Sequence, residues 1–208
     1  MTEQELLSLL STIEPADEAA RAAAHDHWVS RAKPLGGLGA LETMLEDAAA
    51  LTGQTSFDFT NRTVLVFCAD NGVVAQGVSQ SDSSVTRAVA ENLVLHRTSV
   101  CRMADIARCK VLPIDIGMAL GKVDGMLDRR IADGTADFTL GAAMTREQAV
   151  AAIGVGMELV RERKAAGDTL LATGEMGIGN TTTSSAVAAV LLGCPVEEMT
   201  GRGAGLSD

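Results

Sequence analysis

Compact apolar runs recur along this chain at intervals that suit buried strands. Runs rich in Val, Leu, Ile and Phe predict strands near residues 64–69, 111–116 and 169–172. Helical spacing of apolar residues fills the intervals between them. Strands that alternate with helices are typical of a parallel sheet covered on both faces, so we predict an α/β fold with three layers and a mostly parallel, doubly wound sheet.

The helical intervals carry their own boundary signals. Residues 87–107 are predicted as one helix, and residues 145–166 as a long helix that Thr145 begins as a cap, with Gln148 three residues later. Each predicted strand ends in glycine or polar residues. In open parallel sheets ligands bind beyond the carboxyl ends of the strands, so we expect the functional site there.

The N-terminal part has a different pattern. Residues 2–32 have the apolar spacing of one or two amphipathic helices, with a break at Pro15. A Lys-Pro-Leu-Gly-Gly-Leu-Gly segment at residues 33–39 interrupts this pattern before a helix resumes. We therefore divide the chain into an N-terminal helical segment, residues 1–32, and an α/β nucleotide-binding domain, residues 33–208.

Composition removes several classes of partner. The 208 residues carry a formal net charge of -10 and are 47% hydrophobic and only 2% aromatic. This balance argues against nucleic acid or an anionic membrane as the partner, and base-stacking platforms are nearly absent. The four cysteines and three histidines lack metal-ligand spacing, and no apolar run has the length of a membrane span, so we expect a soluble cytoplasmic protein without a metal.

The most informative chemistry lies in residues 173–183, where Glu175 stands beside a glycine-rich turn. Residues 184–192 then continue as an apolar helix. Glycines allow the backbone to approach a ligand, while Asn180 and Thr181 can cap the helix and leave its first N–H groups pointing at a phosphate. The alternative is a plain tight turn. No Lys follows the glycines, which disfavours a kinase of the P-loop type.

These segments together resemble the nicotinate-nucleotide:dimethylbenzimidazole phosphoribosyltransferases, which activate the lower ligand of cobamides. The motifs that carry the resemblance run from about residue 31 to the end of the chain. They are Lys33–Gly39 with Leu41-Glu42, Ala69–Val73, Gly77–Ser79 with Val85-Thr86, Asp115–Gly117, Gly134-Thr135 with Asp137-Phe138, Ala143–Thr145, Gly174–Thr182 and Gly201–Gly205.

The resemblance implies transfer of ribose 5-phosphate from nicotinate mononucleotide to dimethylbenzimidazole or a related base, giving α-ribazole phosphate and nicotinate. No metal or other cofactor takes part, and the family works as a homodimer. A nitrogen of the base attacks the anomeric carbon while a carboxylate accepts the proton of the other nitrogen. The N-terminal helices are implied to form part of a smaller domain.

Glu175 corresponds to the acidic residue of the family's glycine loop. It is implied to act as general base or as electrostatic support, and the alternative is that it only holds the loop. The residues expected to bind substrate are Asp70 and Ser79 on the base side, Asp115 at a strand end facing the same crevice, and Gly174, Gly177, Gly179, Asn180 and Thr181 around the phosphate. Asp70 can equally cap the Asn71-Gly72 turn.

Two departures from the family pattern qualify this interpretation. The loop at residues 79–86 lacks the family's aromatic, proline and carboxylate, and Asn71 replaces a histidine, so a purine or a phenolic base also stays open. The family continues beyond the Gly-Arg-Gly segment with a second catalytic carboxylate, whereas this sequence stops at Asp208. We expect a form that is impaired or inactive alone, and the alternatives to an enzyme are a nucleotide-binding or oligomerisation module, or a fragment of a split or longer enzyme.

Overall fold

A computed structural model describes residues 1–203 of the chain. Their contacts define two compact units: residues Leu7–Phe59 form one, and Met1–Leu6 with the chain from Thr60 onward form the other. The predicted division between residues 32 and 33 falls inside the first unit and stays a prediction. Ala204 and Gly205 of the Gly201–Gly205 motif lie outside the described residues.

The first unit is built on two helices. Helix α2 spans Glu18–Val29 and helix α3 spans Ala40–Thr52, and they pack together through small side chains. The Asp17 carboxylate caps α2 by accepting a hydrogen bond from the Ala20 N–H at 3.0 Å. Between the helices, the buried Glu42 carboxylate accepts from Lys33 Nζ at 2.8 Å and from the Leu38 N–H at 2.9 Å. This pair fixes the 33–39 loop, and the loop's interruption of the helical pattern is as expected.

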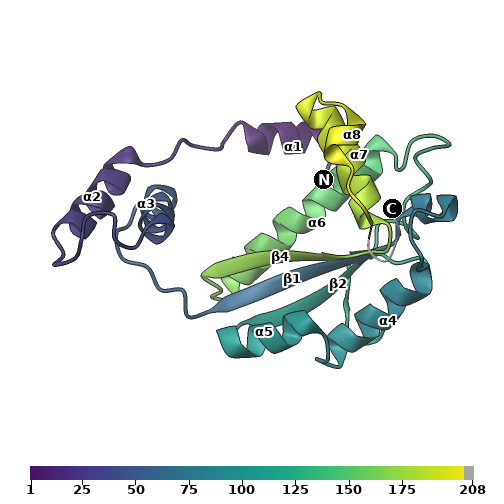
Figure 1. Cartoon of the computed structure of the whole chain (residues 1–208), viewed down its shortest axis with the longest axis horizontal. Helices are drawn as coiled ribbons and strands as arrows, with labels where there is room; N and C mark the ends of the chain where they lie inside the picture. Colours follow the sequence, from purple (N-terminus) through teal and green to yellow (C-terminus); the bar gives the residue numbers. More distant parts are fainter. Residues whose placement is uncertain (204–208) are drawn as a thin grey trace. The chain divides into compact units, whose positions relative to one another are not determined.

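The second unit is built on a four-stranded parallel sheet in the order β3-β2-β1-β4. Figure 1 labels the three longer strands, β2, β1 and β4. The strands are β1 Arg62–Ala69, β2 Lys110–Gly117, β3 Leu127–Asp128 and β4 Leu170–Met176. The predicted parallel α/β sheet is therefore confirmed. Strand β1 lies in the centre because its run of apolar residues is buried on both faces.

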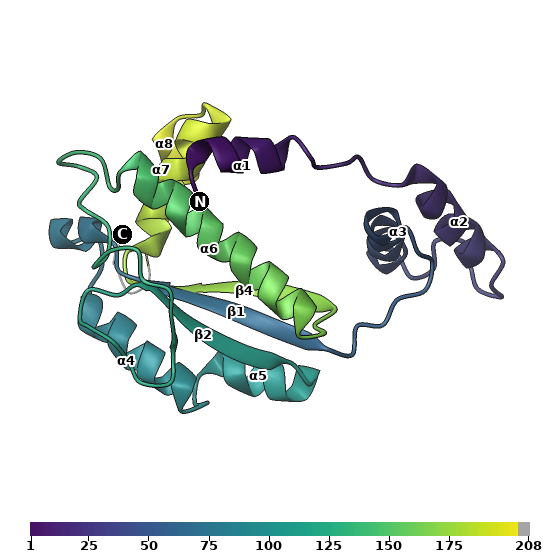
Figure 2. The same cartoon turned by 180° about the vertical axis from the view of Figure 1, so that it is seen from behind.

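Helices cover both faces of this sheet (Figure 2). Helix α6, Arg146–Ala165, packs its buried Val155 and Leu159 on Leu65 and Ile114. Helices α4, Ser83–Val94, and α5, Ser99–Ala107, cover the opposite face. The core on that side contains Val66, Cys68, Ala90, Leu93, Cys101 and Met118. Three layers result, as the sequence predicts.

The remaining elements are mostly short. Helix α1 spans Glu3–Leu10, the 3-10 helix η1 spans Gly72–Gln76, α7 spans Asn180–Leu192 and α8 spans Val196–Met199. Among the described residues, no helix is long and apolar enough to cross a bilayer.

One predicted helix was wrong in its extent. Residues 87–107 were predicted as continuous, but α4 ends at Val94 and α5 begins at Ser99. His96 adopts a left-handed conformation with φ of 58°, which a helix cannot contain. Thr98 then caps α5 through its hydroxyl, which accepts from the Cys101 N–H at 3.5 Å. By contrast, the predicted capping box of Thr145 and Gln148 is confirmed.

Candidate functional site

The carboxyl ends of β1 and β4 bring two loops together. In the parallel register Phe67 lies opposite Glu175 and Cys68 lies opposite Met176, so the residues after each strand emerge side by side. The register of β1 against β2 shifts between Cys68 and Ala69. The site residues predicted from the 70–72 and 174–181 segments therefore gather at the edge of the sheet formed by the carboxyl ends of its strands.

Strand β4 is longer than predicted, and this changes the place of Gly174 and Glu175. The sequence predicted the strand to end at residue 172, but it continues to Met176. Gly174 pairs with Val66 inside the sheet, where an added Cβ would make an ordinary contact of 3.4 Å with the Val66 side chain. The glycine loop proper is Gly177–Gly179. Gly174 is thus a strand residue, while Glu175 projects from the end of the strand.

The glycine loop has no room for side chains. A Cβ on Gly177 would clash with the Ala69 carbonyl oxygen and would lie 2.7 Å from Oε1 of Glu175. Gly179 has φ of +86°, a conformation that favours glycine, and a Cβ there would lie 2.7 Å from Cγ2 of Val74. Both positions require glycine for tight packing of the loop against the segment that follows β1.

Helix α7 starts from this loop without a side-chain cap. The sequence predicted Asn180 and the threonines as caps, but Gly179 occupies the N-cap position and no side chain accepts a capping bond. Asn180 instead donates its amide to Oε2 of Glu175, and its backbone N–H donates to the Gly177 oxygen at 3.1 Å. The N–H groups of Thr181 and Thr182 belong to the first turn, where no acceptor exists within the helix. They remain suited to an anion.

A cavity of about 460 Å³ opens beside this helix start. Four of the lining residues carry hydroxyl groups, and Arg202 adds a positive charge. Its lining is Val78, Thr181, Thr182, Ser185, Thr200, Gly201, Arg202 and Gly203. A helix N-terminus attracts anions through its dipole, so the cavity suits a phosphate group.

Sequence reasoning placed Thr181 in this site but missed Thr182, Ser185 and Arg202 as lining residues. A helical spacing of three from Thr182 to Ser185 was a usable signal, because it puts both hydroxyls on one face. The basic residue of the Gly-Arg-Gly segment was another.

Glu175 is an exposed carboxylate with a perturbed proton affinity. Partial desolvation by surrounding protein atoms raises its pKa, and the hydrogen bond donated by Asn180 works in the opposite direction. A carboxylate with a raised pKa is a better proton acceptor near neutral pH than an ordinary one. Its position next to the glycine loop places that acceptor at the same edge as the anion cavity.

Asp70 and Asp115 are buried and bind backbone. Oδ2 of Asp70 accepts from the Ala119 N–H at 2.8 Å, and Oδ1 of Asp115 accepts from the Met118 N–H at 2.9 Å. Arg130 donates to the other oxygen of Asp115, Oδ2, at 2.7 Å. The two carboxylates therefore fix the segment after β2. Asp115 lies within β2, two residues before its end at Gly117, and not at the strand end as predicted.

The carboxylates around Cys68 give this sheet edge a negative field. Burial is the largest cause that raises the pKa of the Cys68 thiol to about 12, and the charges of Asp115, Glu175 and Asp70 add to it. Cys68 is thus an inert thiol. A positively charged group of a ligand is favoured in this field.

Ser79 lies in the loop after η1, where its Oγ accepts from the Ser81 N–H at 3.1 Å. Its neighbour Val78 lines the anion cavity. Within residues 1–203, no cluster of three or more His, Cys, Asp or Glu side chains is arranged to hold a metal ion.

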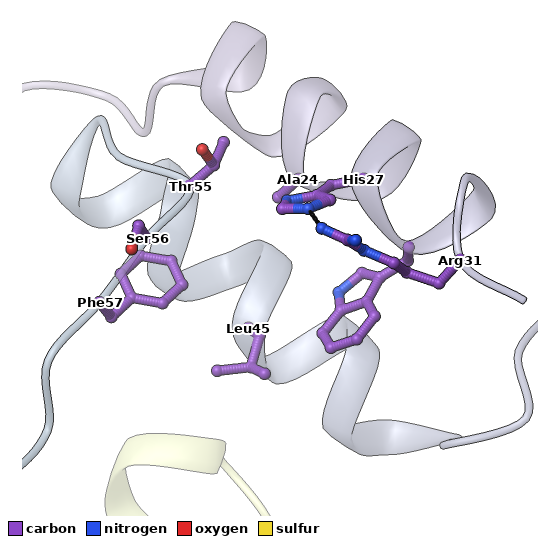
Figure 3. Close-up of a pocket in the computed structure, with 8 residues that line it drawn as sticks. Ala24, His27, Arg31, Leu45, Thr55, Ser56 and Phe57 are labelled. Atoms are coloured by element: carbon purple, nitrogen blue, oxygen red, sulfur yellow. Dashed lines mark hydrogen bonds between the residues drawn. The ribbon is translucent and has the colours of Figure 1, made fainter. Parts of the chain in front are cut away.

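A second cavity, of about 330 Å³, lies within the helical unit (Figure 3). Figure 3 shows the Arg31 guanidinium against the His27 ring, and the apolar side chains of Leu45 and Phe57 also line the cavity. Lys33 Nζ lies 5.6 Å from the ring centre of Trp28, which also lines the cavity. None of the predicted site residues lines this cavity.

Comparisons with known proteins find relatives that match almost the whole chain. A family model described as "DBI_PRT: Phosphoribosyltransferase" matches residues 13–208. The nicotinate-nucleotide–dimethylbenzimidazole phosphoribosyltransferase of Clostridium acetobutylicum is 44% identical over 176 residues, which cover 84% of this chain and 50% of that protein. The enzyme of the same name from Geobacter sp. strain M21 is 42% identical over 205 residues, which cover 98% of this chain and 59% of that protein.

A solved structure is similar as well. The crystal structure of CobT from Thermus thermophilus matches with a TM-score of 0.85 and 39% sequence identity, over 91% of this chain and 58% of that one. The chain thus spans between 50% and 59% of the length of these relatives.

Proposed function

We propose a function for this chain on the basis of its family, because it belongs to the phosphoribosyltransferases named for nicotinate nucleotide and dimethylbenzimidazole. The proposed function is to bind nicotinate mononucleotide and to transfer its ribose 5-phosphate to an aromatic base. The observation that carries the proposal is the placement of Glu175 beside a hydroxyl-rich anion cavity at one sheet edge. An anion cavity for the phosphate with a carboxylate beside it for the transferred proton suits a phosphorylated sugar that carries a cationic ring at its anomeric carbon.

The phosphate is proposed to bind at the start of α7. Thr181, Thr182, Ser185 and Arg202 all line the cavity there. A phosphate group gains both hydrogen bonds and the favourable end of the helix dipole at such a site. The rigid Gly177–Gly179 loop keeps these donors in place before the substrate arrives.

The transfer step needs one proton acceptor. A lone pair on one nitrogen of the base forms the new bond to the anomeric carbon, while the bond from that carbon to the pyridinium nitrogen breaks. The bonding electrons neutralise the departing nicotinate ring. The proton on the second nitrogen of the base passes to the Glu175 carboxylate, whose pKa is raised by desolvation.

The test is a direct assay of the 208-residue chain with nicotinate mononucleotide and a panel of benzimidazole, purine and phenolic bases. We expect slow formation of the ribotide of one base class, in keeping with an impaired form, and we expect Glu175→Gln to lose at least about 100-fold in kcat/KM, which is the lower range for removal of a general base. Glu158→Gln serves as the matched control, since Glu158 lies exposed on α6, away from the glycine loop. Full activity in Glu175→Gln refutes the assigned role.

A second candidate is a module that binds the nucleotide without turning it over. The observation that favours it is the exposed apolar surface of α7, where Val190 is 81%, Leu191 78% and Leu192 70% exposed. Such a surface is typical of an interface with further polypeptide. Binding of nicotinate mononucleotide without any product supports this candidate over the enzyme.

We also propose that the protein forms a homodimer. The same apolar surface of α7 provides a means of association. Sedimentation equilibrium of the wild type against Leu191→Glu is the test, and a wild type that stays monomeric at high concentration refutes the dimer.

A further inference from the structure

Asn71 connects the turn after β1 to the glycine loop and to α7. Its Nδ2 donates to the Ile178 carbonyl oxygen at 3.1 Å, and its Oδ1 accepts from Thr183 Oγ1 at 3.0 Å. An amide donates at one end and accepts at the other, and both ends are used here. Neither a carboxylate nor an apolar side chain of this size reproduces the pair of contacts.

Ile178 of the glycine loop is also held through its backbone N–H. The Ile178 N–H donates to Thr86 Oγ1 at 3.1 Å, and Thr86 has no exposed surface. Asn71 therefore binds the C=O of Ile178, and Thr86, which lies on α4, binds its N–H. This fixes the orientation of the loop that precedes the first turn of α7.

Asn71 also borders the space beside Glu175. A Cβ on Gly177 would lie 2.7 Å from Oε1 of Glu175 and 3.0 Å from Nδ2 of Asn71, so both side chains border the position that this missing atom leaves open. The neutral amide is thus a near neighbour of the carboxylate across Gly177.

We infer that Asn71 is a positioning residue, which holds the Gly177–Gly179 loop in its anion-binding conformation and keeps an uncharged group next to the Glu175 carboxylate. Its catalytic meaning rests on the proposed function, whereas its structural contacts do not.

The uncharged state of the Asn71 side chain matters because several carboxylates lie in this part of the protein. Asp70 precedes Asn71 in sequence, and Asp70, Asp115 and Glu175 all lie close enough to Cys68 for their charges to act on its thiol, with the charge of Asp115 balanced by Arg130. The side chains that α4 and α7 contribute to the network, Thr86, Asn180 and Thr183, are uncharged. A carboxylate in place of Asn71 adds a further negative charge near Glu175 and also removes the donor to Ile178.

The first experiment follows the carboxyl carbon of Glu175 by nuclear magnetic resonance as the free chain is titrated. We expect Asn71→Asp to raise the pKa of Glu175 by about one unit or more, because a like charge within a few ångströms disfavours ionisation. Asn92→Asp makes the same chemical change at an exposed position of α4 and is expected to leave the titration unchanged. Equal titration of Glu175 in the two variants overturns the inference.

The second experiment measures the affinity for nicotinate mononucleotide in Thr183→Val and Asn71→Leu. We expect Thr183→Val to weaken binding about 2- to 10-fold, as for loss of one hydrogen bond, and Asn71→Leu to weaken it further. These variants also keep the inference testable if Asn71→Asp does not fold. Unchanged affinity in both refutes the loop-holding role. If the wild type does not bind the nucleotide, the proposed function fails, but the titration of Glu175 still decides the placement of Asn71.

Discussion

Substitution of Gly177 by alanine isolates the steric requirement of the glycine loop. Gly177 does not have a positive φ, so alanine meets no backbone strain there. Its Cβ clashes with the Ala69 carbonyl oxygen, and it lies 2.7 Å from Oε1 of Glu175 and 3.0 Å from Nδ2 of Asn71. The carbonyl oxygen belongs to the backbone at the end of β1 and cannot rotate away.

Overpacking of this kind costs about 1–3 kcal/mol. Because the clash involves backbone, we expect a cost of about 3 kcal/mol, equivalent to a fall in Tm of about 6–12 °C for a domain of this size. If Asn71 moves to relieve the clash, its contacts with Ile178 and Thr183 break as well. Affinity for nicotinate mononucleotide then falls together with stability.

The assay is thermal unfolding, monitored by far-ultraviolet circular dichroism. The single tryptophan, Trp28, lies in the helical unit, so its fluorescence does not report on the sheet. Gly156→Ala is the control, because an added Cβ at this position of α6 meets nothing within 4 Å. It is expected to stabilise the protein by up to about 1 kcal/mol through helix propensity. A Gly177→Ala protein as stable as the wild type refutes the steric argument.

Three further predictions concern the same unit. Thr86→Val removes the acceptor of the Ile178 N–H in a fully buried position, so we expect a loss of about 1–3 kcal/mol in urea unfolding. Thr86→Ser keeps the hydroxyl and is expected to lose only about 1 kcal/mol, for its deleted buried methyl group. Leu159→Ala opens a cavity in the core under α6, and we expect it to cost about 3 kcal/mol by the same measurement; a loss below about 1 kcal/mol contradicts the packing. Glu175→Gln tests the raised pKa by its effect on Tm across pH. A raised pKa in the folded state means that the stability contributed by the protonated form is lost as pH rises through that pKa, so the neutral variant should gain Tm relative to wild type as pH rises from acid to neutral. A difference that does not change with pH contradicts the desolvation of Glu175.

Local patterns in the sequence determined the frame of the protein. The three apolar runs formed β1, β2 and β4. Strands β1 and β2 have a partner on each side, which suits their buried apolar residues, whereas β4 pairs only with β1 in the described sheet and its residues are exposed or half-buried. The Thr145 capping box was also predictable, since its two bonds join residues three positions apart. The parallel order and the gathering of polar residues at the carboxyl ends follow from the alternation of strands and helices.

The tertiary structure alone decided how the glycine loop is held. Thr86 and Asn71 form hydrogen bonds with Ile178 across sequence separations of 92 and 107 residues. The local sequence around these three residues does not predict either hydrogen bond. The same packing drew Gly174 and Glu175 into β4, where pairing with β1 continues past the predicted strand end. Apolar periodicity records which residues a strand or helix buries, whereas a hydrogen bond between distant loops depends on how the finished sheet places their ends, so it becomes visible only in three dimensions.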